Sequence, residues 1–233
     1  HERLVGSEMC IRDSGTEMVT VAMKRIELDN EEDDMLKHIR HPHIQLLPNT
    51  SGVRTAEESL RILEEMERQG IRKLWLTPHI MEDIPNTTDA LKTRFRTLCE
   101  SYRGNIRLEL AAEYMLDNLF VRRLEADDIL PLHEEKRYLL VETSYFNPPM
   151  RLLSMLKHIQ EKGYHPLLAH PERYEYMQMA DYKALQQAGV AFQLNIPSLA
   201  GMYGKHVQKK AEALQEAGMY LSLIHISEPT RRS

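Results

Sequence analysis

Four side chains of the kinds that bind metal ions follow the ends of predicted strands. They are His79 after the run 72–77, Glu113 after 106–112, Glu142 after 138–141 and His170 after 167–169. The carboxyl ends of parallel strands meet at one rim of a β/α barrel, so we expect these four side chains to converge there. Imidazole and carboxylate groups together suit zinc, manganese or iron better than calcium or magnesium alone.

A His-x-His pair, formed by His41 and His43, precedes these four residues. In an extended chain both imidazoles point to the same face, so both can reach one metal site. The sequence therefore predicts a metal centre with six candidate ligands, which are His41, His43, His79, Glu113, Glu142 and His170.

Each candidate also has an ordinary structural explanation. A single histidine after a strand is commonly a loop residue, and a single glutamate there is commonly a partner of a helix N-terminus. Helix capping does not require His or Glu after strand upon strand, however. The repetition in one chain favours the metal site over the ordinary explanation.

Strand and helix patterns alternate along the chain from Thr55, where Thr55 and Glu58 have the spacing of a capping box. Helices are predicted over about 55–70, 87–104, 118–125, 148–163, 181–188 and 205–217, and strands over 72–77, 106–112, 138–141, 167–169, 190–194 and 219–221. Glycines end most of these helices, and no hairpin signal separates the strands. The pattern predicts an α/β fold with a parallel sheet or barrel and helices outside it.

Composition limits the class of protein. The chain has 233 residues, of which 42% are hydrophobic, and this is enough for one sizeable core. A net charge of -5 argues against a nucleic-acid partner. No apolar run approaches the roughly 20 residues of a membrane span. Two cysteines are too few for a disulfide framework, so we expect a cytoplasmic protein.

Cys99 lies in a helical pattern, and we expect it to be a buried small hydrophobic residue rather than a nucleophile. It also lacks an arginine six residues later, because position 105 is Asn105. We therefore expect the chemistry of this chain to proceed without a cysteine nucleophile.

Both ends of the sequence are set apart from the domain. Residues 2–14 and 222–233 look like translated sequencing adapter, and we exclude them from the fold. We expect an extension of doubtful origin over 1–34, one domain over 35–221, and a tail over 222–233.

The motif His170-Pro171-Glu172-Arg173-Tyr174 resembles a known family. Together with Thr77-Pro78-His79, Ala112-Glu113-Tyr114 and Val141-Glu142-Thr143, it is similar to the bacterial polymerase-and-histidinol-phosphatase (PHP) superfamily. Within that superfamily the sequence most resembles the metal-dependent protein tyrosine phosphatases of capsule and exopolysaccharide loci, the CpsB/CapC type. The resemblance spans about 55–221.

This resemblance implies a distorted, TIM-like PHP-type barrel with a multinuclear site for divalent metal ions. Manganese is the first expectation, with iron, zinc or cobalt as alternatives. It also implies hydrolysis of phosphotyrosine on a bacterial tyrosine kinase that governs polysaccharide export. By motif, His79, Glu113, Glu142 and His170 would be metal ligands, and Arg173 would hold the substrate phosphate.

Two departures from the family pattern keep alternatives open. The acids that accompany His-x-His in the family are absent around His41 and His43, and the closing Asp-x-His after 219–221 is missing. We therefore expect a barrel that is incomplete at both ends. The alternatives are a phosphatase of histidinol phosphate or another small ester, and a truncated, inactive barrel that merely binds metal.

Overall fold

The computed structural model describes residues 18–22, 45–49, 56–68, 71–133 and 135–220, with side chains from Ser59 onward. The strands are β1 Met18–Ala22, β2 Gln45–Asn49, β3 Lys73–Leu76, β4 His79–Ile80, β5 Arg107–Leu110, β6 Glu113–Met115, β7 Tyr138–Glu142, β8 His165–Ala169 and β9 Ala191–Asn195. The helices are α2 Ala56–Arg68, α3 Thr88–Ser101, α4 Asn118–Glu125, α5 Leu152–Glu161, the 3₁₀ turn η3 Pro171–Arg173, α6 Met179–Gln187, α7 Ile196–Leu199 and α8 Lys205–Glu216.

All strand pairings between these elements are parallel, in the order β4-β6-β7-β8-β9-β1-β2-β3-β5. Strand β4 continues β3 after two residues, and β6 continues β5 after two residues. The first and last strands of this order, β4 and β5, therefore belong to two neighbouring stretches of chain. One stretch comprises β3 and β4, the other comprises β5 and β6, and each is interrupted once. Backbone hydrogen bonds from Ala111 to Leu76 and from Glu113 to Pro78 join the segments across the breaks. This arrangement confirms the predicted distorted parallel barrel.

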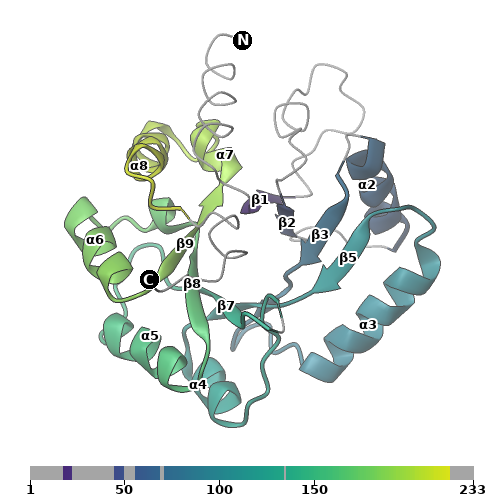
Figure 1. Cartoon of the computed structure of the whole chain (residues 1–233), viewed down its shortest axis with the longest axis horizontal. Helices are drawn as coiled ribbons and strands as arrows, with labels where there is room; N and C mark the ends of the chain where they lie inside the picture. The colour runs from purple at the N-terminus through teal and green to yellow at the C-terminus, as the bar shows by residue number, and fades with distance from the viewer. Residues whose placement is uncertain (1–17, 23–44, 50–55, 69–70, 134, 221–233) are drawn as a thin grey trace, which may run out of the picture.

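Side chains along the strands alternate between two apolar cores, because successive residues of a strand point to opposite faces. One large cluster includes Leu74, Leu139 and Leu168 together with residues of the surrounding helices. A second, small cluster contains the strand residues Trp75, Leu140, Leu167 and Ala169, together with Ala111 between β5 and β6 and Leu132 before β7. The second set fills the inside of the barrel, and the first lies between the strands and the helices, which surround the strands in Figure 1.

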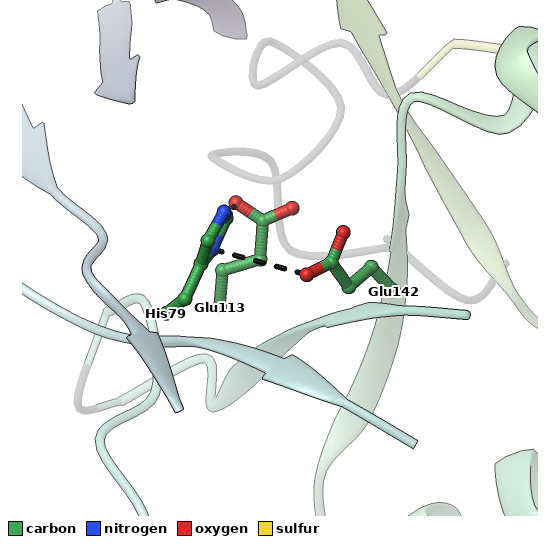
Figure 2. A group of neighbouring side chains, drawn as sticks. All are labelled: His79, Glu113 and Glu142. Carbon is green, nitrogen blue, oxygen red and sulfur yellow. Dashed lines mark ion pairs between the residues drawn. The ribbon is translucent and has the colours of Figure 1, made fainter. Parts of the chain in front are cut away.

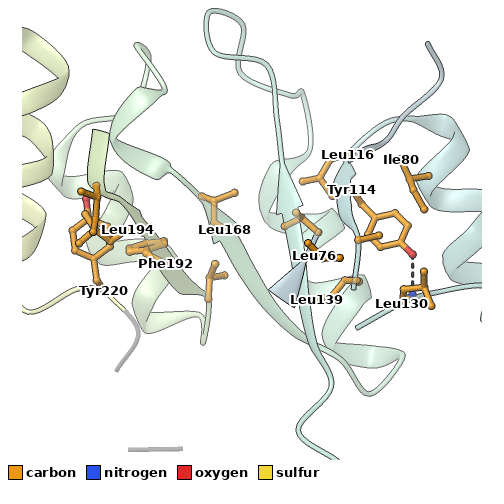
Figure 3. Close-up of a cluster of buried hydrophobic side chains, with 14 of the residues drawn as sticks. Leu76, Ile80, Tyr114, Leu116, Leu130, Leu139, Leu168, Phe192, Leu194 and Tyr220 are labelled. Atoms are coloured by element: carbon orange, nitrogen blue, oxygen red, sulfur yellow. Dashed lines mark hydrogen bonds between the residues drawn. The ribbon is translucent and has the colours of Figure 1, made fainter. Parts of the chain in front are cut away.

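Polar contacts of buried tyrosines also lie within the outer core. The buried Tyr114 hydroxyl accepts a hydrogen bond of 2.8 Å from the backbone N–H of Leu130, as Figure 3 shows. The bond ties β6 to the segment that leads into β7.

Helices α3 and α4 begin where the sequence supplies caps. The Thr87 side chain accepts from the N–H of Ala90 at the start of α3, and Asp117 accepts from the N–H of Phe120 at the start of α4. Helix α5 begins at Leu152, three residues after Pro149, so the prediction of a start at Pro148-Pro149 was early.

Other predictions require correction. Strands β1 and β2 were not expected, and neither was the short helix α7. The predicted strand at 219–221 is represented by one parallel bridge between Phe192 and Tyr220. Among the described residues, no helix combines the length and apolar character needed to cross a membrane.

Candidate metal centre

Strand register brings the four predicted ligands to one end of the barrel. His79 opens β4 and is paired in register with Glu113, which opens β6. Glu142 ends β7 opposite Met115 of β6, and His170 directly follows β8. Inside a barrel, side chains two residues apart share a face, so Glu113 and Glu142 continue the inward rows of Ala111 and Leu140 toward the carboxyl end.

The side chains meet within hydrogen-bond or ion-pair range. Glu113 Oε1 lies 3.1 Å from His170 Nε2, and Glu142 Oε2 lies 3.4 Å from the same nitrogen. His79 Nδ1 lies 3.5 Å from Glu113 Oε2 and 3.9 Å from Glu142 Oε1. Figure 2 shows His79, Glu113 and Glu142 pointing toward a common point. The structure therefore brings His79, Glu113, Glu142 and His170 together, as the sequence predicted.

The chain turns sharply at His170 and thereby aims its imidazole back at the glutamates. His170 has φ 33° and ψ 54°, a left-handed conformation that is uncommon outside glycine and asparagine. Its backbone N–H donates to Gln193 Oε1, and its ring packs against Tyr145 and Tyr174 at centroid distances of 5.6 and 5.8 Å. Strained backbone of this kind is frequent at functional sites.

Burial makes the electrostatics of this cluster strong. Burial alone would lower the pKa of His170, but its contacts with Glu113 and Glu142 outweigh burial and raise that pKa to about 9. Burial also works against the charged form of Glu142, yet the hydrogen bond and charge of His170 hold the pKa of this carboxyl below its usual value. In the absence of metal the cluster is therefore held together by an imidazolium between two carboxylates.

The donor atoms fit a divalent cation. One ligand atom from each of His79, Glu113 and Glu142 lies within 4.8 Å of the others. His79 Nδ1 is buried and has no hydrogen-bond partner among the described residues, although two carboxylates lie beside it. A buried nitrogen without a partner costs free energy, and a cation shared with the carboxylates would give it one.

Arg173 lies at the edge of this cluster. Its guanidinium carbon is 4.3 Å from the ring centroid of Tyr145 and 4.4 Å from that of Tyr203. Two aromatic rings therefore contact one cation, which restricts where its donors can point. The charge of Arg173 also helps to hold the pKa of Glu142 low.

The remaining sequence predictions have different outcomes. His41 and His43 lie outside the described residues, so their role as ligands stays a prediction. The prediction that Cys99 is buried was wrong, because Cys99 is exposed on α3, where its outward position keeps it from the core. Partial burial and the nearby Glu100 raise the pKa of its thiol, which makes it a poor nucleophile at neutral pH.

Sequence reasoning missed the residues that support the centre. Gln193 shares the inward row of β9 and fixes the backbone of His170, and an alternating strand pattern could have identified it. Tyr145 and Tyr203 lie in loops, and no spacing in the sequence relates them to Arg173.

The chain is a parallel β/α barrel whose carboxyl rim carries clustered imidazole and carboxylate groups. These features place it in the class of barrels with a candidate metal centre. The model of one family, described as capsular polysaccharide synthesis, CpsB/CapC, matches residues 39–225. The chain belongs to the CpsB/CapC family.

A solved structure supports the same fold. It comes from work on YwqE from Bacillus subtilis and CpsB from Streptococcus pneumoniae, which are described as unique metal-dependent tyrosine phosphatases. The likeness has a TM-score of 0.61 and 25% sequence identity, and covers 71% of this chain and 69% of that chain.

Curated relatives of a different kind also match this chain. Thiazole synthase from Phocaeicola vulgatus is 60% identical over 89 residues, and thiazole synthase from Bacteroides fragilis is 54% identical over 89 residues. Each match covers 36% of this chain, and the chain spans about a third of the length of these curated relatives (34%). A match of this extent concerns a segment and gives no account of the metal centre.

Proposed function

We propose that this chain is a metal-dependent phosphatase of tyrosine-phosphorylated protein. The observation that carries the proposal is the meeting of His79, Glu113, Glu142 and His170 at the carboxyl mouth of the barrel. Membership of the CpsB/CapC family and the likeness to metal-dependent tyrosine phosphatases support the choice of substrate.

His79, Glu113, Glu142 and His170 would hold divalent cations, with manganese as the first candidate and iron, zinc or cobalt as alternatives. His41 and His43 are further candidate ligands. When bound, such cations polarise phosphoryl oxygens and lower the pKa of water. Glu113 and Glu142 would balance the charge of the cations, and the backbone contact of His170 with Gln193 would keep that imidazole oriented.

Arg173 would bind the phosphate group. A guanidinium presents two parallel N–H donors to two phosphate oxygens, which a lysine cannot do. The flanking rings of Tyr145 and Tyr203 would hold the guanidinium in position before substrate arrives. Negative charge that grows on the phosphoryl oxygens during hydrolysis would then meet a fixed cation.

The proposed partner is a bacterial tyrosine kinase of polysaccharide export, in line with the family's description as capsular polysaccharide synthesis. The cytoplasm, where such a kinase would present its phosphotyrosines, is the proposed location.

The test is turnover of a phosphotyrosyl peptide and of p-nitrophenyl phosphate by the purified chain. We expect activity that EDTA abolishes and that added manganese or cobalt restores. His79→Ala should remove activity, whereas His206→Ala, an exposed histidine on α8, should not. Activity that resists the chelator, or that survives His79→Ala, would contradict the proposal.

A further inference from the structure

A second pocket lies at the opposite end of the barrel from the metal centre. It has a volume of about 760 Å³ and is lined by the starts of β3 and β5, by α3 and by the segment before β7. Lys73 opens β3 and His79 opens β4, so about six residues of extended chain, roughly 20 Å, separate the two mouths. Its volume lies in the range of small-molecule sites, about 300–1,000 Å³.

Two residues that line this pocket carry buried ring nitrogens without a hydrogen-bond partner. Trp75 is 4% exposed, and neither its Nε1 nor the Nε2 of His133 has a hydrogen-bond partner among the described residues. The two rings lie 5.0 Å apart. An indole N–H can only donate, so a ligand that satisfies Trp75 must bring an acceptor.

The loop that carries His133 is held in an uncommon conformation. His133 has φ 54°, and a pair of backbone hydrogen bonds between Leu132 and Tyr138 closes the turn around it. Burial and the charge of nearby Lys73 lower the pKa of His133, so its ring is neutral at neutral pH. The fold thus places an uncharged imidazole over Trp75 at some cost in backbone strain.

The charge of the lining is positive on balance. Its cations are Lys73, Lys92, Arg107 and Lys136, and its carboxylates are Glu109 and Glu135. Glu109 already contacts Lys73 at 3.1 Å and Arg107 at 2.8 Å. Lys92 and Lys136 have no carboxylate partner among the described side chains, so two positive charges remain for a ligand.

The other walls are apolar and follow an unpaired strand edge. Strand β5 is the last strand of the sheet order, so the described part of the sheet pairs it on one side only. Beside that edge lie Phe95 from α3 and the segment Ile129-Leu130-Pro131. An occupant would therefore contact flat apolar surface on one side and lysines on the other.

We infer that this N-terminal mouth is a second binding site, for a small organic anion with a flat apolar body. Trp75 would donate to the anionic group, Lys92 and Lys136 would balance its charge, and Phe95 with Pro131 would pack on its apolar part. The inference does not depend on the proposed phosphatase activity.

The chain contains one tryptophan, so its fluorescence reports on this pocket directly. We suggest titration of the purified chain with benzenesulfonate, an aromatic anion that a phosphatase cannot hydrolyse. Sodium sulfate and benzyl alcohol, which carry the anion and the ring separately, serve as the comparison. We expect saturable binding of benzenesulfonate about tenfold tighter than either comparison compound.

Variants locate the site. Lys92→Gln with Lys136→Gln should weaken benzenesulfonate binding about tenfold, because two charge contacts are lost. Lys157→Gln with Lys183→Gln, two exposed lysines on α5 and α6, should leave it unchanged, and so should His79→Ala at the metal centre. A tryptophan signal that does not saturate, equal binding of benzyl alcohol, or unchanged binding in the Lys92 and Lys136 double variant would overturn the inference.

Discussion

Glu113 Oε1 and His170 Nε2 lie 3.1 Å apart although 57 positions separate the residues in the chain. Glu113 is on β6 and His170 follows β8, so the contact spans the intervening strand β7. It can form only if the register of three neighbouring strands is correct, because a slip by one residue would turn Glu113 out of the barrel. The candidate metal centre is therefore a consequence of strand pairing rather than of any local motif.

Neutralising Glu113 should remove metal binding. Glu113→Gln keeps the size of the side chain but takes away a negative charge, so we expect metal affinity and phosphatase turnover to fall about 100-fold or more. Metal content by mass spectrometry and p-nitrophenyl phosphate turnover provide the measurement. Glu109→Gln, at the opposite mouth on β5, is the matched control and should keep both. Equal losses in the two variants would speak for damage to the fold instead.

The stability of the metal-free chain should fall as pH rises. The pKa of His170 is raised from 6.5 to about 9 in the folded chain, so protonation favours folding. This contribution is fully present below pH 6.5 and is lost as pH passes through about 9. Urea unfolding of EDTA-treated protein across this interval should show a declining free energy of unfolding. His170→Gln should flatten the slope, and a wild-type slope of opposite sign would refute the assignment.

Arg173, which stacks on Tyr145 and Tyr203, should contribute to substrate binding. Arg173→Lys retains the charge but loses the paired donors and the ring contacts, so we expect kcat/KM for a phosphotyrosyl peptide to fall by about 10- to 100-fold. Tyr145→Leu should cost roughly two- to thirtyfold through loss of one cation–π contact, and Tyr145→Phe should cost little. Arg151→Lys, an exposed arginine before α5, is the control. Unchanged kinetics in Arg173→Lys would exclude the proposed phosphate contact.

The Tyr114 hydroxyl should contribute to the stability of the fold but not to metal binding. Tyr114→Phe leaves the N–H of Leu130 without its partner inside the core, and we expect the free energy of unfolding to fall by about 1–2 kcal/mol. Tyr138→Phe is the control, because the Tyr138 hydroxyl makes no hydrogen bond to a described residue, and its change should stay within about 0.5 kcal/mol. Metal content should be unchanged in both variants. An equal effect of the two changes would show that the hydrogen bond adds nothing.

Sequence reasoning recovered the strand ends because buried parallel strands are short apolar runs with a polar residue after them. That pattern located His79, Glu113, Glu142 and His170 without any knowledge of register. It failed at β2, whose sequence Gln45–Asn49 contains a proline that argues against a strand, and at α7, which is too short to show a helical period. The pattern could not identify the two rings beside Arg173, because Tyr145 and Tyr203 lie in loops that are far apart in the sequence.

The predicted roles of His41 and His43 can be tested separately from the four ligands that the structure brings together. If both bind metal, His41→Ala with His43→Ala should lower the number of bound metal ions per chain, because a cation that loses two imidazoles is held only weakly. His38→Ala, a histidine in the same stretch, should not lower it. Metal titration followed by calorimetry measures both number and affinity. Unchanged metal content in the double variant would remove these two histidines from the centre.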